Sequence, residues 1–150
     1  MLSSAAALAD VGPAFARLKA GVQAERAALR ARFQATGDGP RVLREHCRLI
    51  DRTLKDVWRQ LRLPASLALL AVGGYGRGEL YPHSDIDVLI LLKDSASPEL
   101  AAKIEELVGR LWDMGLELGH SVRTVAECVE EAAKDVTVMT SLLEGRLLAG

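Results

Sequence analysis

A glycine-rich segment between two short apolar runs constrains this chain more than any other feature of its sequence. The apolar run 67–72 leads into Gly73–Gly78, and Asp85 and Asp87 then open a second apolar run, 88–92. Short apolar runs bounded by glycine or polar residues predict buried strands. Glycine turns let a phosphate approach the backbone closely, and paired carboxylates can bind a divalent cation. This segment therefore predicts an α/β fold that presents a phosphate-binding turn beside a metal site.

The glycine turn is predicted to bind phosphate through its backbone N–H groups. Gly73 and Gly74 permit a positive φ with no Cβ in the way, and the N–H groups of such a turn attract an anion. Arg77 can add a planar guanidinium fork for a phosphate, or it can pair with Glu79 or a nearby carbonyl. No Gly-Lys-Ser/Thr of the Walker type is present, and Glu79 stands where the dinucleotide fingerprint needs its last glycine.

Asp85 and Asp87 are the predicted metal ligands and catalytic residues. Alternate side chains of a strand share a face, so the two carboxylates project together while Ile86 points into the opposite layer. Like charges this close repel unless a cation lies between them, and hard oxygen ligands suit Mg²⁺ or Mn²⁺. Two such ions, about 3.5–4 Å apart, could hold a triphosphate and activate an attacking hydroxyl. Ser84 and Pro82 fit a turn that feeds this strand, and Ser84 is a further candidate for nucleotide contact.

These residues resemble the amino-terminal region of the bacterial PII uridylyltransferase/uridylyl-removing enzymes, a family within the DNA polymerase β-like nucleotidyltransferase superfamily. The similar segments are Ala71–Leu80, Pro82, Ser84–Asp87, Ile50-Asp51, Trp58, Gly115–Thr124 and Leu147–Gly150. The resemblance covers roughly residues 40–150. It implies the nucleotidyltransferase fold, with a small mixed β-sheet, helices packed on the sheet and an α-helical amino-terminal segment before it.

The resemblance also implies a reaction, which is the metal-dependent transfer of UMP from UTP to a tyrosine hydroxyl of the PII nitrogen-regulatory protein. The turn and the acid pair recognise phosphate, so the residues alone leave open a related transferase that uses ATP or a small hydroxyl acceptor. They also leave open a non-catalytic fragment that binds nucleotide or docks a partner. Family members remove the uridylyl group and sense glutamine through later domains, and neither activity is expected in this 150-residue chain.

The pattern departs from many members of the superfamily at a third carboxylate, which those members supply from the next strand. The corresponding segment here, 118–123, contains no acid. Glu117 lies just before it and shares strand parity with Gly119, so Glu117 is the first choice for the third metal ligand. Asp135 and Glu144 are the alternatives.

The chain is expected to begin with helices and to continue as alternating strands and helices. The expected elements are helices at 13–35 and 41–61, strands at 67–72 and 86–92, a helix from Pro98 to near Gly115, a strand at about 116–123, a helix from the capping box Thr124–Glu127, and a helix from near Asp135 to Glu144. We therefore divide the chain into a helical extension, 1–40, and a nucleotidyltransferase domain, 41–150. The three expected strands make a small sheet, and further strands are expected beyond Gly150.

The composition excludes several classes of partner. Nineteen basic and twenty acidic residues nearly cancel, and no basic stripe is present that would follow nucleic acid. No run approaches the ~20 apolar residues of a membrane span, and Met1–Ala9 lacks the basic leader of a secretion signal and indicates a frayed or helical terminus. Cys47 and Cys128 lack metal-ligand spacing and are expected to be buried thiols of a reducing compartment. We therefore expect a cytoplasmic location without nucleic-acid or membrane partners.

Overall fold

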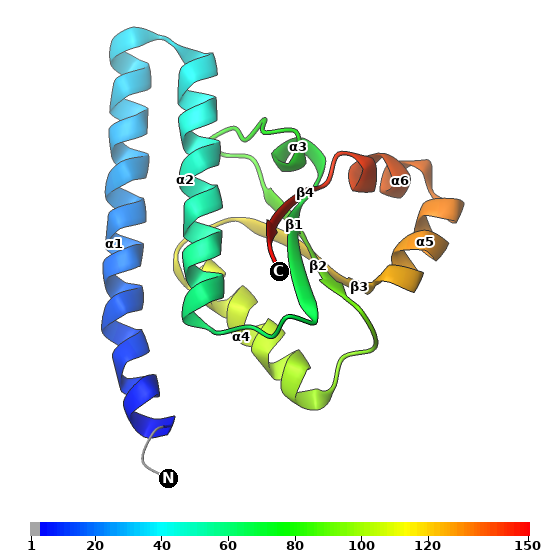
Figure 1. Ribbon diagram of the computed structural model, residues 1–150. Helices are drawn as coiled ribbons and strands as arrows, with labels where there is room; N and C mark the ends of the chain where they lie inside the picture. The colour runs from blue at the N-terminus through cyan, green and yellow to red at the C-terminus, as the bar shows by residue number, and fades with distance from the viewer. Residues whose placement is uncertain (1–3) are drawn as a thin grey trace.

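The computed structural model describes residues 4–150, with side chains described from Gly12 onward. The helices are α1 (Ser4–Thr36), α2 (Gly39–Gln60), α3 (Gly73–Gly76), α4 (Pro98–Asp113), α5 (Val125–Lys134) and α6 (Val136–Leu143), and the strands are β1 (Leu67–Ala71), β2 (Ile86–Leu92), β3 (Leu118–Thr124) and β4 (Arg146–Ala149). Two helices come first, and strands then alternate with helices (Figure 1), which confirms the predicted α/β class. The first three residues of the predicted start, Met1–Ala9, lie outside the described range.

The helices α1 and α2 form an antiparallel hairpin along one side of the molecule (Figure 1). Their connection is the predicted glycine break, where Gly37 has a φ of +66°. Asp38 caps α2 by accepting a hydrogen bond of 3.1 Å from the Arg41 backbone N–H, and Pro40 lies in the first turn. Val22 of α1 belongs to the same hydrophobic core as the sheet, and the division of the chain at residue 40 stays a prediction.

The sheet has the order β3-β2-β1-β4. β1 is antiparallel to both of its neighbours, β2 and β4, whereas β2 and β3 are parallel. The sheet is therefore small and mixed, as expected. The expectation of three strands was wrong, because Arg146–Ala149 pairs with the free edge of β1 as a fourth strand. This segment has only four residues, too few for a periodic strand signal in the sequence.

One face of the sheet carries the main hydrophobic core, and α2 and α4 cover it. The least exposed side chains of this core come from both layers and include Ile50, Leu54, Leu69, Ile90, Leu107 and Leu111. Burying a leucine or isoleucine side chain of this kind contributes roughly 1.5–3 kcal/mol relative to leaving it exposed. α4 starts as predicted, with Ser97 accepting a hydrogen bond from the Leu100 N–H at 3.2 Å. The core thus holds β1 and β2 rigidly against two helices.

The opposite face of the sheet is only partly covered, and residues of α6 line a cavity there together with Leu89 and Ser121. Thr124 and Glu127 form the predicted capping box at the start of α5. Asp135 caps α6 by accepting hydrogen bonds from the Thr137 N–H at 2.8 Å and from its hydroxyl at 2.6 Å. Since Asp87 and Gly119 pair in the parallel register of β2 and β3, both of their side-chain positions belong to this open face.

Candidate active site

The glycine turn folds into the single helical turn α3 directly after β1. Gly73 has a φ of +58°, which a residue with a Cβ adopts only with strain. The Val72 N–H donates to the Asp87 carbonyl at 3.0 Å, so the turn is tied to the strand that carries the acidic pair. Within the part of the chain that the structure describes, the N–H groups of Gly73, Gly74 and Tyr75 donate to no carbonyl or side chain. These three amides are the kind of free donors that the predicted phosphate turn needs.

The carboxylate of Asp87 lies between two glycines. A Cβ on Gly73 would lie 3.6 Å from the Asp87 Oδ2, and a Cβ on Gly119 would lie 2.5 Å from its Oδ1. Real Cβ atoms essentially never approach another atom this closely, so any residue other than glycine at position 119 would displace the Asp87 carboxylate. Sequence reasoning noted that position 119 is not acidic, but it missed the role of the glycine, because the role depends on the pairing of β2 with β3.

Asp85 lies directly before β2 and Asp87 is the second residue of that strand, and both side chains are exposed. Partial burial raises the pKa of Asp87 above its ordinary value, and the nearby Asp85 carboxylate raises it further. The structure therefore brings the predicted pair together closely enough for the two charges to repel. Carboxylate oxygens in this arrangement fit Mg²⁺ or Mn²⁺, which would relieve the repulsion between them.

The third carboxylate ligand stays a prediction. Among residues 4–150, no three Asp, Glu, His or Cys side chains come close enough together to hold an ion as they stand. Glu117 is exposed just before β3, where its backbone carbonyl accepts a hydrogen bond of 2.8 Å from the Ile86 N–H. The alternatives are occupied elsewhere, because Asp135 caps α6 and Glu144 accepts a hydrogen bond of 2.7 Å from Arg77. Glu117 is consequently the candidate with the fewest competing contacts.

The two supporting candidates for nucleotide contact both make bonds within the protein. Arg77 donates to Glu79 at 3.2 Å and to Glu144 at 2.7 Å, and these contacts raise the pKa of its guanidinium. The pairing with Glu79 was one of the two interpretations left open by the sequence. The Ser84 hydroxyl donates to the Tyr81 carbonyl at 2.8 Å and closes the predicted turn before β2. The nucleotide-binding roles of Arg77 and Ser84 stay predictions.

A network of polar contacts joins the glycine turn to α2 and β4, and the sequence did not predict it. Arg146 on β4 donates to both carboxylate oxygens of Asp51 on α2, at 2.6 and 3.1 Å. The Tyr75 hydroxyl of α3 donates to the same Asp51 at 2.7 Å, and Arg146 also donates to the Tyr75 carbonyl at 3.2 Å. Burial and the bond to Asp51 raise the pKa of Tyr75, so its phenol stays protonated. Three elements that are distant in sequence are thus joined at the turn.

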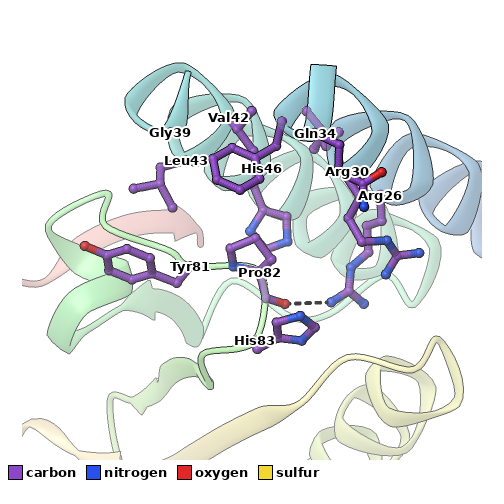
Figure 2. A pocket seen from close by; sticks show the side chains of 12 residues that line it. Arg26, Arg30, Gln34, Gly39, Val42, Leu43, His46, Tyr81, Pro82 and His83 are labelled. Carbon is purple, nitrogen blue, oxygen red and sulfur yellow. Dashed lines mark hydrogen bonds between the residues drawn. The ribbon is translucent and has the colours of Figure 1, made fainter. Parts of the chain in front are cut away.

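A cavity lies beside the segment that leads to Asp85, between that segment and the α1–α2 hairpin. Its volume is about 450 Å³, and its walls are mostly apolar. Figure 2 shows Tyr81, Pro82 and His83 on one side and Val42 on the other, with Arg26 donating to the Pro82 carbonyl at 3.3 Å. None of its lining residues belongs to the glycine turn or to the acidic pair. A smaller cavity of about 240 Å³ lies on the sheet face that carries Asp87.

Comparison with known proteins agrees with this geometry. A family model described as a nucleotidyltransferase domain matches residues 51–140, which is more than half of the chain and includes the glycine turn and the acidic pair. The chain belongs to the nucleotidyltransferase domain family. It is therefore a transferase domain, and the mixed sheet with its preceding helices is the nucleotidyltransferase fold predicted from the sequence.

Curated relatives also confirm the resemblance found in the sequence. The nucleotidyltransferase domain is 53% identical over 131 residues to a bifunctional uridylyltransferase/uridylyl-removing enzyme of Nitrosospira multiformis, covering 83% of this chain and 15% of that enzyme. It is 50% identical over 145 residues to the enzyme of the same description from Burkholderia pseudomallei, covering 97% of this chain and 17% of the relative. The chain thus spans 15–17% of the length of these relatives.

The helices within residues 4–150 differ from membrane-spanning helices. None of them combines the length and the apolar character that crossing a bilayer would need.

Proposed function

We propose that this nucleotidyltransferase domain transfers UMP from UTP to a tyrosine hydroxyl of the PII regulatory protein, with Mg²⁺ or Mn²⁺ as cofactor. The observation that supports this most strongly is the Asp87 carboxylate, which lies beside Asp85 and between Gly73 and Gly119. The choice of UTP and PII rests on about 50% identity to enzymes described as uridylyltransferases. A cytoplasmic location fits these substrates.

In the proposed reaction, the tyrosine hydroxyl gives up its proton to water and its oxygen bonds to the α-phosphorus of UTP, while the bond from that phosphorus to the bridging oxygen breaks and pyrophosphate leaves. Asp85 and Asp87 would hold the divalent cation, which supplies charge stabilisation for the phosphates. The free N–H groups of Gly73, Gly74 and Tyr75 would bind the departing phosphates. The network of Asp51, Tyr75 and Arg146 fixes the turn, so these donors need little reorganisation when the nucleotide binds.

The proposed function is tested by parallel transfer assays with UTP and ATP labelled at the α-phosphate, with purified PII and Mg²⁺. We expect label on PII from UTP and little from ATP. Label from ATP alone, or on a small hydroxyl compound such as an aminoglycoside but not on PII, would favour a related transferase. If no transfer occurs and calorimetry with UTP and Mg²⁺ shows no heat at millimolar ligand, the chain is a docking module and the proposal fails.

A further inference from the structure

The smaller cavity on the open face of the sheet is adjacent to the acidic pair through the strand register. Asp87 pairs with Gly119 and Leu89 pairs with Ser121, so Leu89 and Ser121 lie one step further along the same face. Both line this cavity, and so does Val72, the residue before the glycine turn. A parallel strand rises about 3.3 Å per residue, which places Ser121 ~7 Å and Arg123 ~13 Å along β3 from Gly119. We call this cavity the sheet-face pocket.

The sheet-face pocket is lined by hydrogen-bonding groups that are not used by the protein. Arg123 and Ser121 on β3 and Ser141 on α6 all line it. In the described part of the chain, none of these three side chains makes a hydrogen bond or an ion pair. Arg123 helps to lower the pKa of Glu127, but the Glu127 carboxylate accepts its hydrogen bonds from Thr124. Arg123 is half-buried, so an arginine without a partner there is unusual.

The size and the walls of the pocket suit one flat ring. Its volume of about 240 Å³ is below the ~300–1,000 Å³ of pockets that enclose a whole drug-sized ligand. Leu89, which is buried in the sheet, and Val138 of α6 both line the pocket, so a ring bound there would contact apolar side chains from the sheet and from α6. Apolar side chains do not stabilise the charge of a triphosphate. In the proposed function, the phosphates bind the amides of the glycine turn and the cation held by the acidic pair.

We propose that the sheet-face pocket binds the nucleobase of the nucleotide and that Arg123 selects uracil over adenine. Arginine has only N–H donors, so it matches the carbonyl oxygens of uracil. The N6 amino group of adenine is itself a hydrogen-bond donor, so it cannot accept a hydrogen bond from the arginine N–H groups. Ser121 and Ser141 can donate or accept and would complete the contacts with the ring. The inference rests on the proposed nucleotide transfer and assigns the choice between UTP and ATP to named residues.

The test compares binding of UTP, ATP and inorganic triphosphate to the whole chain by calorimetry with Mg²⁺. The variants are Arg123→Gln, Arg123→Lys and the control Arg59→Gln, which removes an arginine from the exposed end of α2 where it pairs only with Asp56 and the helix backbone. For Arg123→Gln, we expect about a tenfold or greater loss of UTP affinity, little change for ATP and none for inorganic triphosphate. Arg123→Lys should lose most of the same preference, because lysine lacks the planar fork.

Three outcomes would overturn the assignment of the base pocket while leaving the proposed reaction standing. The first is an equal loss of UTP and triphosphate affinity in Arg123→Gln with recovery in Arg123→Lys, which would make Arg123 a phosphate ligand. The second is unchanged UTP binding. The third is a raised KM for the protein acceptor alone, which would make the pocket an acceptor site. If the wild-type chain binds none of the three ligands, the proposed function and this inference fail together. Circular dichroism of each variant controls for folding.

Discussion

Arg146 donates hydrogen bonds to both carboxylate oxygens of Asp51, at 2.6 and 3.1 Å, and so joins the last strand to α2 beneath the glycine turn. The two residues are separated by 95 positions in the sequence. The Tyr75 hydroxyl donates to the same carboxylate, which makes Asp51 the centre of the network. The bond to Asp51 raises the pKa of Arg146 above its ordinary value, so the guanidinium keeps its charge.

Asp51→Asn should lower the free energy of unfolding by about 1–3 kcal/mol, because it leaves the Arg146 charge without its carboxylate. The lower part of that range is expected, since the Arg146 side chain remains 35% exposed and water can solvate it. Tyr75→Phe removes one hydrogen bond and should cost about 1 kcal/mol. Urea unfolding at constant m-value measures both changes.

The matched control for Asp51→Asn is Asp56→Asn, the same chemical change on the same helix. Asp56 pairs with Arg59 on the surface of α2, where an exposed ion pair contributes roughly 0–1 kcal/mol. Equal destabilisation by the two substitutions would contradict the central role given to Asp51.

Gly119→Ala should abolish magnesium-dependent nucleotide binding with little loss of stability. The new Cβ would lie 2.5 Å from the Asp87 Oδ1, and the carboxylate can rotate away more easily than the strands can separate. Calorimetry with UTP and Mg²⁺ measures the binding, and urea unfolding measures the stability. Gly109→Ala in α4 is the control, because nothing lies within 4 Å of its Cβ position. It should raise stability by about 0.5–1 kcal/mol and leave binding unchanged.

His46 should make the stability of the chain depend on pH near neutrality. Burial lowers the pKa of His46, and its Nδ1 hydrogen-bonds the Leu80 carbonyl at 3.1 Å while its Nε2 has no partner. The unfolded chain therefore takes up this proton at a higher pH than the folded chain. Stability from His46 is complete above about pH 6.5, the ordinary histidine value, and is lost as the pH falls through the folded-state pKa.

Urea unfolding at several pH values between 5 and 7.5 measures this effect. In His46→Asn, the slope of the unfolding free energy against pH should flatten. A wild-type slope in His46→Asn would show that another group titrates in this range.

Asp85→Asn and Asp87→Asn should each abolish transfer while the fold remains intact. The raised pKa of Asp87 means that its ionisation costs stability in the absence of a cation, and this cost grows as the pH rises above about 4. Asp87→Asn should therefore leave the stability at pH 7 unchanged or slightly higher. The transfer assay with labelled UTP measures activity, with the exposed Asp94→Asn as control. More than a tenth of wild-type activity in either active-site variant would contradict the assigned roles.

Local sequence signals predicted the elements that carry the site. Glycine breaks, caps and apolar runs are short-range features, so the hairpin connection at Gly37, the cap at Ser97 and the capping box at Thr124 were all confirmed. The paired parity of Asp85 and Asp87 likewise depends only on the two-residue period of a strand. These features needed no knowledge of the tertiary structure.

Features that depend on pairing between distant segments could not be predicted. The contact of Gly119 with Asp87 requires the parallel register of β2 and β3, and the Asp51–Arg146 pair requires β4 to lie beside β1. The alternation within one strand indicates which of its residues share a face, but it does not identify the residues of another strand that lie opposite them. The polar lining of the sheet-face pocket was missed for the same reason, since Ser121 and Ser141 meet only in the folded chain.

Anomalous diffraction at the manganese edge tests the central claim most directly, using crystals soaked with Mn²⁺ and a non-hydrolysable UTP analogue. The account predicts a manganese peak within bonding distance, about 2.0–2.3 Å, of carboxylate oxygens from both Asp85 and Asp87. It also predicts phosphate oxygens at the N–H groups of Gly73, Gly74 and Tyr75. Manganese bound elsewhere, or a triphosphate that lies away from the glycine turn, would contradict it.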